Sequence, residues 1–136
     1  MTTSNMNAVI QCDIHKVWET ISTVDRYHTW RSDVDKTELT DEKRFTEYTK
    51  SGYPTTFTVT ASNPQRRWEL DVENSHTQGH WTVVLTPKGS VTEIDITACV
   101  TAKQLSLRPI GKNVFEQSYL KKMQRQFIAD LKKFLE

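Results

Sequence analysis

Hydrophobic residues near the end of the chain recur at the spacing of an α-helix. Residues 113–136 therefore predict one long amphipathic helix, in which Asn113 is the N-cap and Glu116 completes a capping box. Lysine and arginine residues occupy its opposite side. A helix with one apolar side needs a partner, and the preceding residues predict a sheet that can provide one. The apolar stripe consists of Leu120, Met123, Phe127, Leu131 and Phe134, flanked by Gln124, Ile128 and Leu135.

From residue 34 to residue 101, hydrophobic and polar residues alternate, which is typical of β-strands with one buried face. Short segments rich in turn-forming residues separate the alternating stretches, and this pattern predicts an antiparallel meander. The clearest stretch places Trp68, Leu70 and Val72 on one face. The predicted strands are Val34–Leu39, Arg44–Lys50, Thr55–Ser62, Arg67–Glu73, Gly79–Thr86 and Val91–Thr101.

The N-terminal part of the chain predicts a short strand followed by helical segments. Asn5–Cys12 reads as the strand, and Asp13 has the position of an N-cap because hydrophobic residues follow it at helical spacing. A second helical turn is predicted at Asp25–Trp30. The segment Ala102–Lys112 contains a proline and a glycine and is predicted to be irregular. No repeat or linker divides the chain, so residues 1–136 are expected to form a single domain.

Composition narrows the range of partners. The formal net charge is +1, so no electrostatic attraction to nucleic acid or to an anionic membrane is expected. No apolar stretch is long enough to predict a membrane-spanning helix. The N-terminus lacks the basic and apolar regions of a signal peptide, and a cytoplasmic protein is therefore expected. The sequence does not indicate an oligomeric state.

Two cysteines, Cys12 and Cys99, lie in the first and last predicted strands. If these strands pair antiparallel, the two thiols lie far apart along them, and free thiols are therefore predicted. Neither cysteine has a histidine at a metal-ligand spacing, and phosphate-binding loops and nucleophile motifs are absent from the sequence. We therefore expect no metal and no cofactor.

The order strand, helix, short helix, six strands and long helix resembles the helix-grip fold of the START/Bet v 1-like superfamily, also called SRPBCC, in its polyketide cyclase/dehydrase-like branch. The resemblance implies an α+β fold in which a curved antiparallel sheet surrounds the last helix and leaves a cavity between them. It is carried by Ile14–Ile21 with its Val-Trp pair, by Tyr27 and Trp30, and by Phe57–Thr60, Asn63–Trp68, Gly79–Trp81 and Gly89–Thr92.

Members of this superfamily bind or carry lipids, sterols, polyketides and hormones, and some cyclise or dehydrate polyketide chains. The resemblance therefore implies binding or carriage of a small hydrophobic or amphipathic ligand between the sheet and the last helix. The alternatives are a cyclase/dehydratase-like enzyme acting on a polyketide-like substrate and a chaperone-regulator-like interaction module. The residues expected to contact the ligand are Tyr27, Trp30, Tyr48, Phe57, Trp68, Trp81, Glu116, Leu120, Met123 and Phe127.

Each aromatic residue in this set is also explained by ordinary core packing. An enzyme additionally needs an acid or base that faces the cavity, where burial would shift its pKa. Alternation places His80 on the opposite side from Trp81, so that it faces outward. Glu47 and Tyr48 face opposite sides of one strand, and a shift of the register by one residue would exchange them.

Overall fold

The computed structural model describes the backbone of residues 1–103 and 109–136 and the side chains of residues 1–103 and 117–136. Within these residues, seven strands form one antiparallel sheet in the order β1-β7-β6-β5-β4-β3-β2. The elements are β1 (Thr2–Ile10), α1 (Ile14–Ser22), the 3-10 helix η1 (Val24–Thr29), β2 (Lys36–Leu39), β3 (Arg44–Tyr48), β4 (Pro54–Asn63), β5 (Arg67–Glu73), β6 (Thr77–Lys88), β7 (Val91–Ala102) and α2 (Pro109–Leu135).

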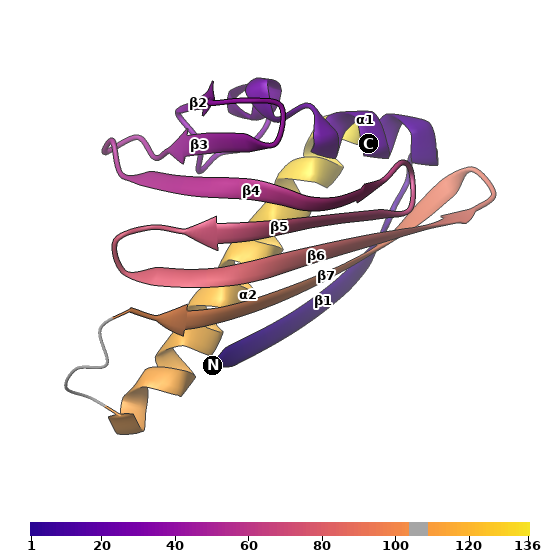
Figure 1. Cartoon of the computed structure of the whole chain (residues 1–136). Coiled ribbons are helices and arrows are strands. Elements are labelled where there is room, and N and C mark those ends of the chain that lie inside the picture. Colours follow the sequence, from indigo (N-terminus) through magenta and orange to yellow (C-terminus); the bar gives the residue numbers. More distant parts are fainter. Residues whose placement is uncertain (104–108) are drawn as a thin grey trace.

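The long helix α2 lies across one face of the curved sheet (Figure 1). We call this face the inner face and the opposite one the outer face. Strands β2 to β7 are each hydrogen-bonded to the next along the chain, and β1 closes the order by pairing with β7. The α+β helix-grip fold predicted from the sequence is therefore confirmed, including the meander and the terminal helix.

The start of α2 was predicted incorrectly. The helix begins at Pro109, so Asn113 lies within it and is not its N-cap, and the predicted capping box with Glu116 is wrong. The reason is that proline is well suited to the first turn of a helix, where its missing N–H has no partner to lose. Sequence reasoning instead treated Pro109 as a helix breaker. The rest of the segment predicted to be irregular includes residues 104–108, which lie outside the described residues.

The buried side of α2 is rotated slightly from the predicted stripe. Leu120, Gln124, Ile128 and Leu131 are buried, whereas Phe134 is 52% exposed. Residues four apart lie almost above one another on a helix, so the buried line follows these positions and passes beside Phe134. The prediction that Phe134 belongs to the apolar stripe was therefore wrong.

A buried amide attaches α2 to the sheet. The side chain of Gln124 is fully buried, and its Nε2 donates to the backbone oxygens of Ser4, at 3.0 Å, and Ile96, at 3.1 Å. Its Oε1 accepts a hydrogen bond of 2.7 Å from the Ser4 hydroxyl. One side chain thus satisfies groups on β1 and β7 together, which sets the position of the helix against both strands.

Two carboxylates hold the C-terminal half of α2. Asp130 is buried and accepts hydrogen bonds from the backbone N–H of Ser32, at 2.8 Å, and from its hydroxyl, at 2.9 Å. Glu136 accepts a hydrogen bond of 2.8 Å from the backbone N–H of Gln11. These contacts attach the helix to the segment that follows η1 and to the end of β1.

His80 faces the outer side of the sheet, as alternation predicted. Its Nδ1 lies 2.8 Å from Asp71 and its Nε2 lies 2.8 Å from Glu69. Because ionised carboxylates only accept hydrogen bonds, both ring nitrogens must donate, and this requires the imidazolium form. Burial acts to lower the pKa of His80, but the hydrogen bonds and charges of Asp71 and Glu69 outweigh it and raise the pKa.

The two cysteines are free, as predicted. In the register of β1 and β7, Cys99 lies opposite Thr3 and Thr92 lies opposite Ile10, two residues before Cys12. The thiols therefore lie near opposite ends of this strand pair.

Replacing Gln124 by leucine should destabilise the fold. The Gln124→Leu variant keeps the volume but removes the hydrogen bonds of Gln124 to the carbonyls of Ser4 and Ile96 and the acceptor of the Ser4 hydroxyl, which costs about 1–3 kcal/mol. Urea unfolding measures the loss as a lower midpoint with an unchanged slope. The matched control is Gln117→Leu, on an exposed turn of the same helix where the amide donates one hydrogen bond to Thr3, and it should change stability by less than about 0.5 kcal/mol. Equal effects of the two variants would contradict the role assigned to Gln124.

The contribution of His80 to stability should decrease as the pH rises. The pKa of His80 is raised in the folded protein above 6.5, the ordinary pKa of histidine. The imidazolium therefore stabilises the fold fully at pH values below 6.5, and this stabilisation is lost as the pH rises through the pKa of the folded state. The imidazole is 36% exposed, so the difference between wild type and His80→Gln should stay below about 1 kcal/mol. Urea titrations from about pH 6 to about pH 9 measure it. A constant difference across this range would show that folding does not raise the pKa of His80.

Candidate functional site

The inner face of the sheet is unevenly buried. Leu70, Val83 and Ile94 are fully packed, whereas Phe57, Val59 and Trp81 remain only half-buried on the same face. On α2, Met123 and Phe127 are also half-buried. We call this set of apolar side chains the inner patch, consisting of Phe57, Val59, Trp81, Met123 and Phe127. It leaves apolar surface within reach of solvent where the sheet and the helix face each other.

The packing of hydrophobic residues shows the same interruption. One large core cluster includes Leu70, Val83 and Leu131, and a second, smaller one contains Ala98, Val100 and Leu120. Trp81 packs against both clusters, and within the described residues Met123 belongs to neither. Among the described residues the buried side chains thus form two clusters, and Phe57, Val59 and Phe127 of the inner patch pack against the larger one.

A buried ion-pair cluster lies close to Phe127. The guanidinium of Arg31 donates to Glu47 at 2.8 Å and to Asp33 at 2.8 and 3.2 Å, and the side chains of Arg31 and Glu47 are only 9% and 10% exposed. We call Arg31, Asp33 and Glu47 the Arg31 cluster. The guanidinium carbon lies 5.0 Å from the ring centre of Tyr27 and 5.3 Å from that of Phe127, within the range of cation–π attraction.

The environment of Glu47 shifts its proton affinity. Burial raises the pKa of Glu47, since it disfavours the charged carboxylate, and the positive charge of Arg31 acts in the opposite direction. Burial acts to lower the pKa of Arg31, but Glu47 and Asp33 outweigh it, so the guanidinium stays charged. An ion pair is thus held at the inner face, on the strand where the sequence offered Glu47 and Tyr48 as alternative polar groups.

Tyr48 does not face the inner patch, contrary to the prediction. Its hydroxyl donates a hydrogen bond of 2.7 Å to Glu38, and the ammonium of Lys36 lies 4.8 Å from the centre of its ring. The buried residues of β3 are Phe45 and Glu47, so Tyr48 is on the outer face. Either orientation of this short strand would place one polar residue, Glu47 or Tyr48, on the inner face. The pairing of Phe45 with Phe57 in the sheet decides that this residue is Glu47.

Three further predicted contact residues are part of the packed core. Tyr27, Trp68 and Leu120 are 2%, 4% and 2% exposed, so the structure does not place them on an accessible surface. The hydroxyl of Tyr27 donates to the backbone oxygen of Ile21, which satisfies its polar end within η1 and α1. The side chain of Glu116, which was also predicted, lies outside the described residues.

Trp30 connects η1 to α2. Its ring centre lies 5.4 Å from that of Phe127 in an edge-to-face arrangement and 6.2 Å from that of Phe134, on which it stacks. The residue is 9% exposed, and its buried Nε1 has no hydrogen-bond partner within the described residues. An unpaired buried donor costs stability, so Trp30 is a position where a polar group of a ligand or a water would be favourable.

Tyr119 was missed by sequence reasoning. It extends from α2 with 55% of its surface exposed. Partial burial raises the pKa of its phenol, and Tyr53 and Asp33 add to the rise through their charges. The phenol is therefore within the range of the charges of Tyr53 and Asp33.

Arg31 and Asp33 were also missed. The signal available in the sequence was a single arginine directly after the aromatic segment that ends in Trp30, followed by an aspartate two positions later. That signal is weak, because charged residues after a helical turn are common on surfaces.

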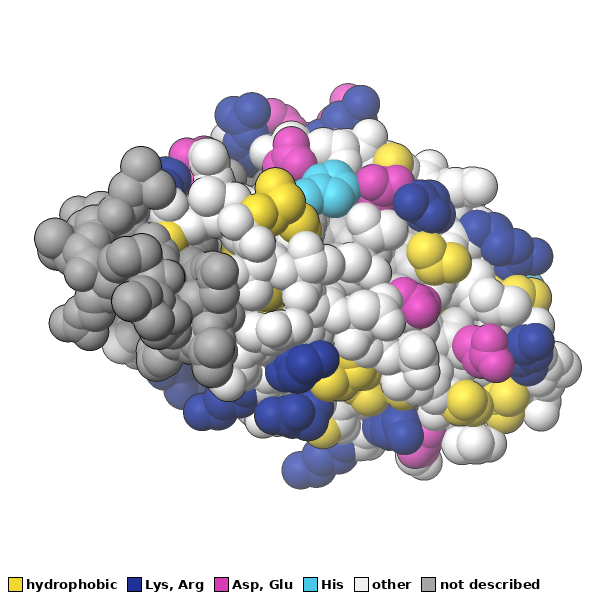
Figure 2. All heavy atoms as spheres, turned by 90° about the horizontal axis from the view of Figure 1, so that it is seen from below, with side chains coloured by type: hydrophobic (Ala, Val, Ile, Leu, Met, Phe, Trp, Pro, Cys, Tyr) yellow, Lys and Arg dark blue, Asp and Glu magenta, His cyan; other side chains and the backbone are white. Residues whose placement is uncertain are grey.

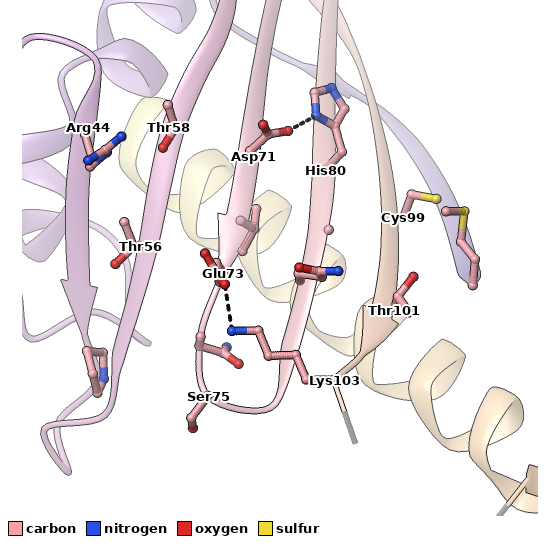
Figure 3. Close-up of a pocket in the computed structure, with 16 residues that line it drawn as sticks. Arg44, Thr56, Thr58, Asp71, Glu73, Ser75, His80, Cys99, Thr101 and Lys103 are labelled. Carbon is pink, nitrogen blue, oxygen red and sulfur yellow. Dashed lines mark hydrogen bonds and ion pairs between the residues drawn. The ribbon is translucent and has the colours of Figure 1, made fainter. Parts of the chain in front are cut away.

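A depression of about 850 Å³ lies on the outer face (Figure 3). Its charged groups are largely paired with each other, as in the contacts of His80 with Asp71 and of Lys103 with Glu73 at 2.7 Å. It is open to solvent and lined mainly by polar side chains that are exposed or half-buried. Among the described residues, no group of His, Cys, Asp or Glu is placed to hold a metal ion. We therefore take the inner patch and the Arg31 cluster as the candidate site.

Solved structures with the same fold have little sequence identity to this chain. A START superfamily protein from Mycobacterium smegmatis superposes with a TM-score of 0.83 at 9% identity, covering 99% of this chain and 97% of that one. A conserved protein from Geobacillus kaustophilus gives a TM-score of 0.82 at 16% identity, with 98% and 94% covered. The di-domain ARO/CYC protein BexL from the BE-7585A biosynthetic pathway gives 0.82 at 11% identity, and this chain covers 46% of it.

The sequence comparisons give a family but no individual relative. Among curated proteins, no sequence matches this chain. A family described as "Polyketide cyclase / dehydrase and lipid transport" matches residues 1–136. Together with the helix-grip structures, this match confirms the resemblance seen in the sequence, and the chain belongs to the polyketide cyclase / dehydrase and lipid transport family.

Proposed function

We propose that this protein binds a small hydrophobic or amphipathic ligand between the inner face of the sheet and α2, and that it sequesters or carries this ligand. The observation that supports the proposal most strongly is the inner patch, in which apolar side chains of the sheet and of α2 remain half-buried. The family and the fold both fit ligand binding.

The chemistry of the inner patch suits an amphipathic molecule. Aromatic and aliphatic side chains with few polar groups are typical of small-molecule sites. Each aromatic-sized portion of a ligand that is removed from water would contribute about 2 kcal/mol. The Arg31 cluster lies beside Phe127 and supplies charged groups at one end of this apolar surface. An enclosed cavity beneath α2 stays a prediction.

A cyclase/dehydratase-like enzyme is the second candidate, and one observation favours it. Glu47 faces the inner side, is hydrogen-bonded to Arg31, and has a raised pKa, which are properties of a general acid or base. His80 and Tyr48, the other polar candidates in the sheet, are on the outer face. Among the described residues this candidate therefore depends on Glu47, whereas Glu116, which was also predicted, has its side chain outside them.

The interaction-module alternative has less support. On the face shown in Figure 2, hydrophobic side chains are scattered among polar and charged ones rather than joined in one large patch, and basic side chains lie at several margins of the molecule. Among the described residues, no helix is long and apolar enough to cross a membrane. The cytoplasmic location, the single domain and the absence of nucleic-acid partners stay predictions. The exposed large hydrophobic residues are Met1, Val9, Leu39, Tyr119 and Phe134.

Native mass spectrometry of the freshly purified protein tests the proposed function directly. We expect a copurifying small molecule whose mass adds to that of the chain and which organic solvent extracts. Incubation of the extracted molecule with fresh protein separates the two candidates. An unchanged mass supports carriage, whereas loss of water or ring closure, abolished in Glu47→Gln, supports the enzyme.

A bulky residue at Met123 should block the proposed site. Met123 is half-buried and outside both core clusters, so Met123→Trp should occupy ligand space without disturbing the fold. We expect the affinity for Nile red, a neutral apolar dye, to fall about tenfold, equivalent to about 1.4 kcal/mol. Fluorescence titration measures the affinity, and thermal unfolding checks the fold.

The matched control for this prediction is Lys122→Trp, on the exposed side of the same helix turn. It should leave the dye affinity within about twofold of wild type. Equal affinity in wild type and Met123→Trp would show that the dye does not bind at the inner patch.

A further inference from the structure

The polar end of the candidate site carries more negative than positive charge. One guanidinium, that of Arg31, pairs with two carboxylates, those of Asp33 and Glu47. From α2, the buried carboxylate of Asp130 approaches the neighbouring residue Ser32 and adds a further negative charge. Arg31 is therefore already compensated before any ligand arrives.

Glu47 has unused hydrogen-bonding capacity. Its Oε2 accepts from Arg31, whereas its Oε1 has no hydrogen-bond partner among the described residues. The residue as a whole is 8% exposed. A donor brought by a ligand can hydrogen-bond to this free carboxylate oxygen.

Thr37 provides a second unsatisfied group beside Glu47. The two residues lie directly opposite each other in the register of β2 and β3, so their side chains are on the same face. The hydroxyl of Thr37 is buried and has no hydrogen-bond partner within the described part of the chain. A ligand hydroxyl can donate to a carboxylate and accept from a neighbouring hydroxyl at the same time.

We propose that the polar end of the ligand is a hydrogen-bond donor, a hydroxyl or an amine, which Glu47 accepts, and that the site discriminates against ligands ending in a carboxylate. This inference rests on the proposed function and names the ligand class for the same site. A ligand carboxylate would bring a like charge next to Glu47 and Asp33 in a poorly hydrated place, which is strongly unfavourable. A hydroxyl or an ammonium group brings no negative charge and therefore avoids this repulsion.

A matched series of ligands tests the inference. Decanol, decylamine and decanoate share one apolar chain and differ in the end group, and each displaces bound Nile red if it occupies the inner patch. We expect decanol and decylamine to displace the dye from the wild-type protein at concentrations about tenfold lower than decanoate. Below micelle formation, fluorescence titration measures these concentrations.

Variants then test whether Glu47 is the cause. Glu47→Gln removes one negative charge at nearly constant size, and the difference between decanol and decanoate should shrink to about threefold or less. Asp33→Asn, at a side chain that is 39% exposed, should reduce the difference in the same direction and replaces Glu47→Gln if that variant does not fold. The control is Glu73→Gln, which removes the same charge from the outer face and should leave the ranking unchanged.

The outcomes separate this inference from the proposed function. Decanoate binding as tightly as decanol, or an unchanged ranking in both charge variants, would overturn the inference and leave the proposed function intact. Failure of Nile red and of all three ligands to bind would overturn both. The expected ranking, lost in Glu47→Gln or Asp33→Asn and kept in Glu73→Gln, supports both.

Discussion

The position of α2 on the sheet depends on one buried amide. Gln124 is surrounded by apolar residues, yet its donors and its acceptor are all used by Ser4 and Ile96. A buried polar group of this kind is favourable in one arrangement and costly in every other, so it specifies rotation and height of the helix more sharply than apolar contacts alone. With α2 held in this way against β1 and β7, the remaining sides of the helix do not need to fill the interior.

The side chains that attach α2 to the rest of the protein differ from those that α2 contributes to the inner patch, and this accounts for the candidate site. Gln124 attaches the middle of α2 to one edge of the sheet, and Asp130 attaches its later part to the segment after η1. Met123 and Phe127 lie on the side of the helix that these contacts leave free and stay half-buried. Asp130 also fixes Ser32, the neighbour of Arg31, so the same contacts that hold the helix position the ion pair with Glu47.

Much of the fold could be predicted from local patterns, whereas the site could be predicted only in part. Strict alternation identified the inner residues of β5, β6 and β7, and it placed His80 on the outer face. The same reasoning could not decide between Glu47 and Tyr48, because β3 is short and either parity is chemically reasonable. Trp68 and Trp81 had identical patterns in the sequence, yet one is packed and the other half-buried, since their burial depends on distant residues of α2 and β7.

The sequence by itself determined the order and type of the elements, the meander and the amphipathic last helix, because these follow from the hydrophobic periodicity and turn residues of neighbouring positions. Only the tertiary structure decided which side of α2 is buried, that Arg31 meets Glu47, and that Trp81 packs against both core clusters. These features join residues far apart in the chain, and no local pattern encodes the packing of a helix against strands that begin over a hundred positions earlier, as Ser4 and Gln124 do at a separation of 120 residues.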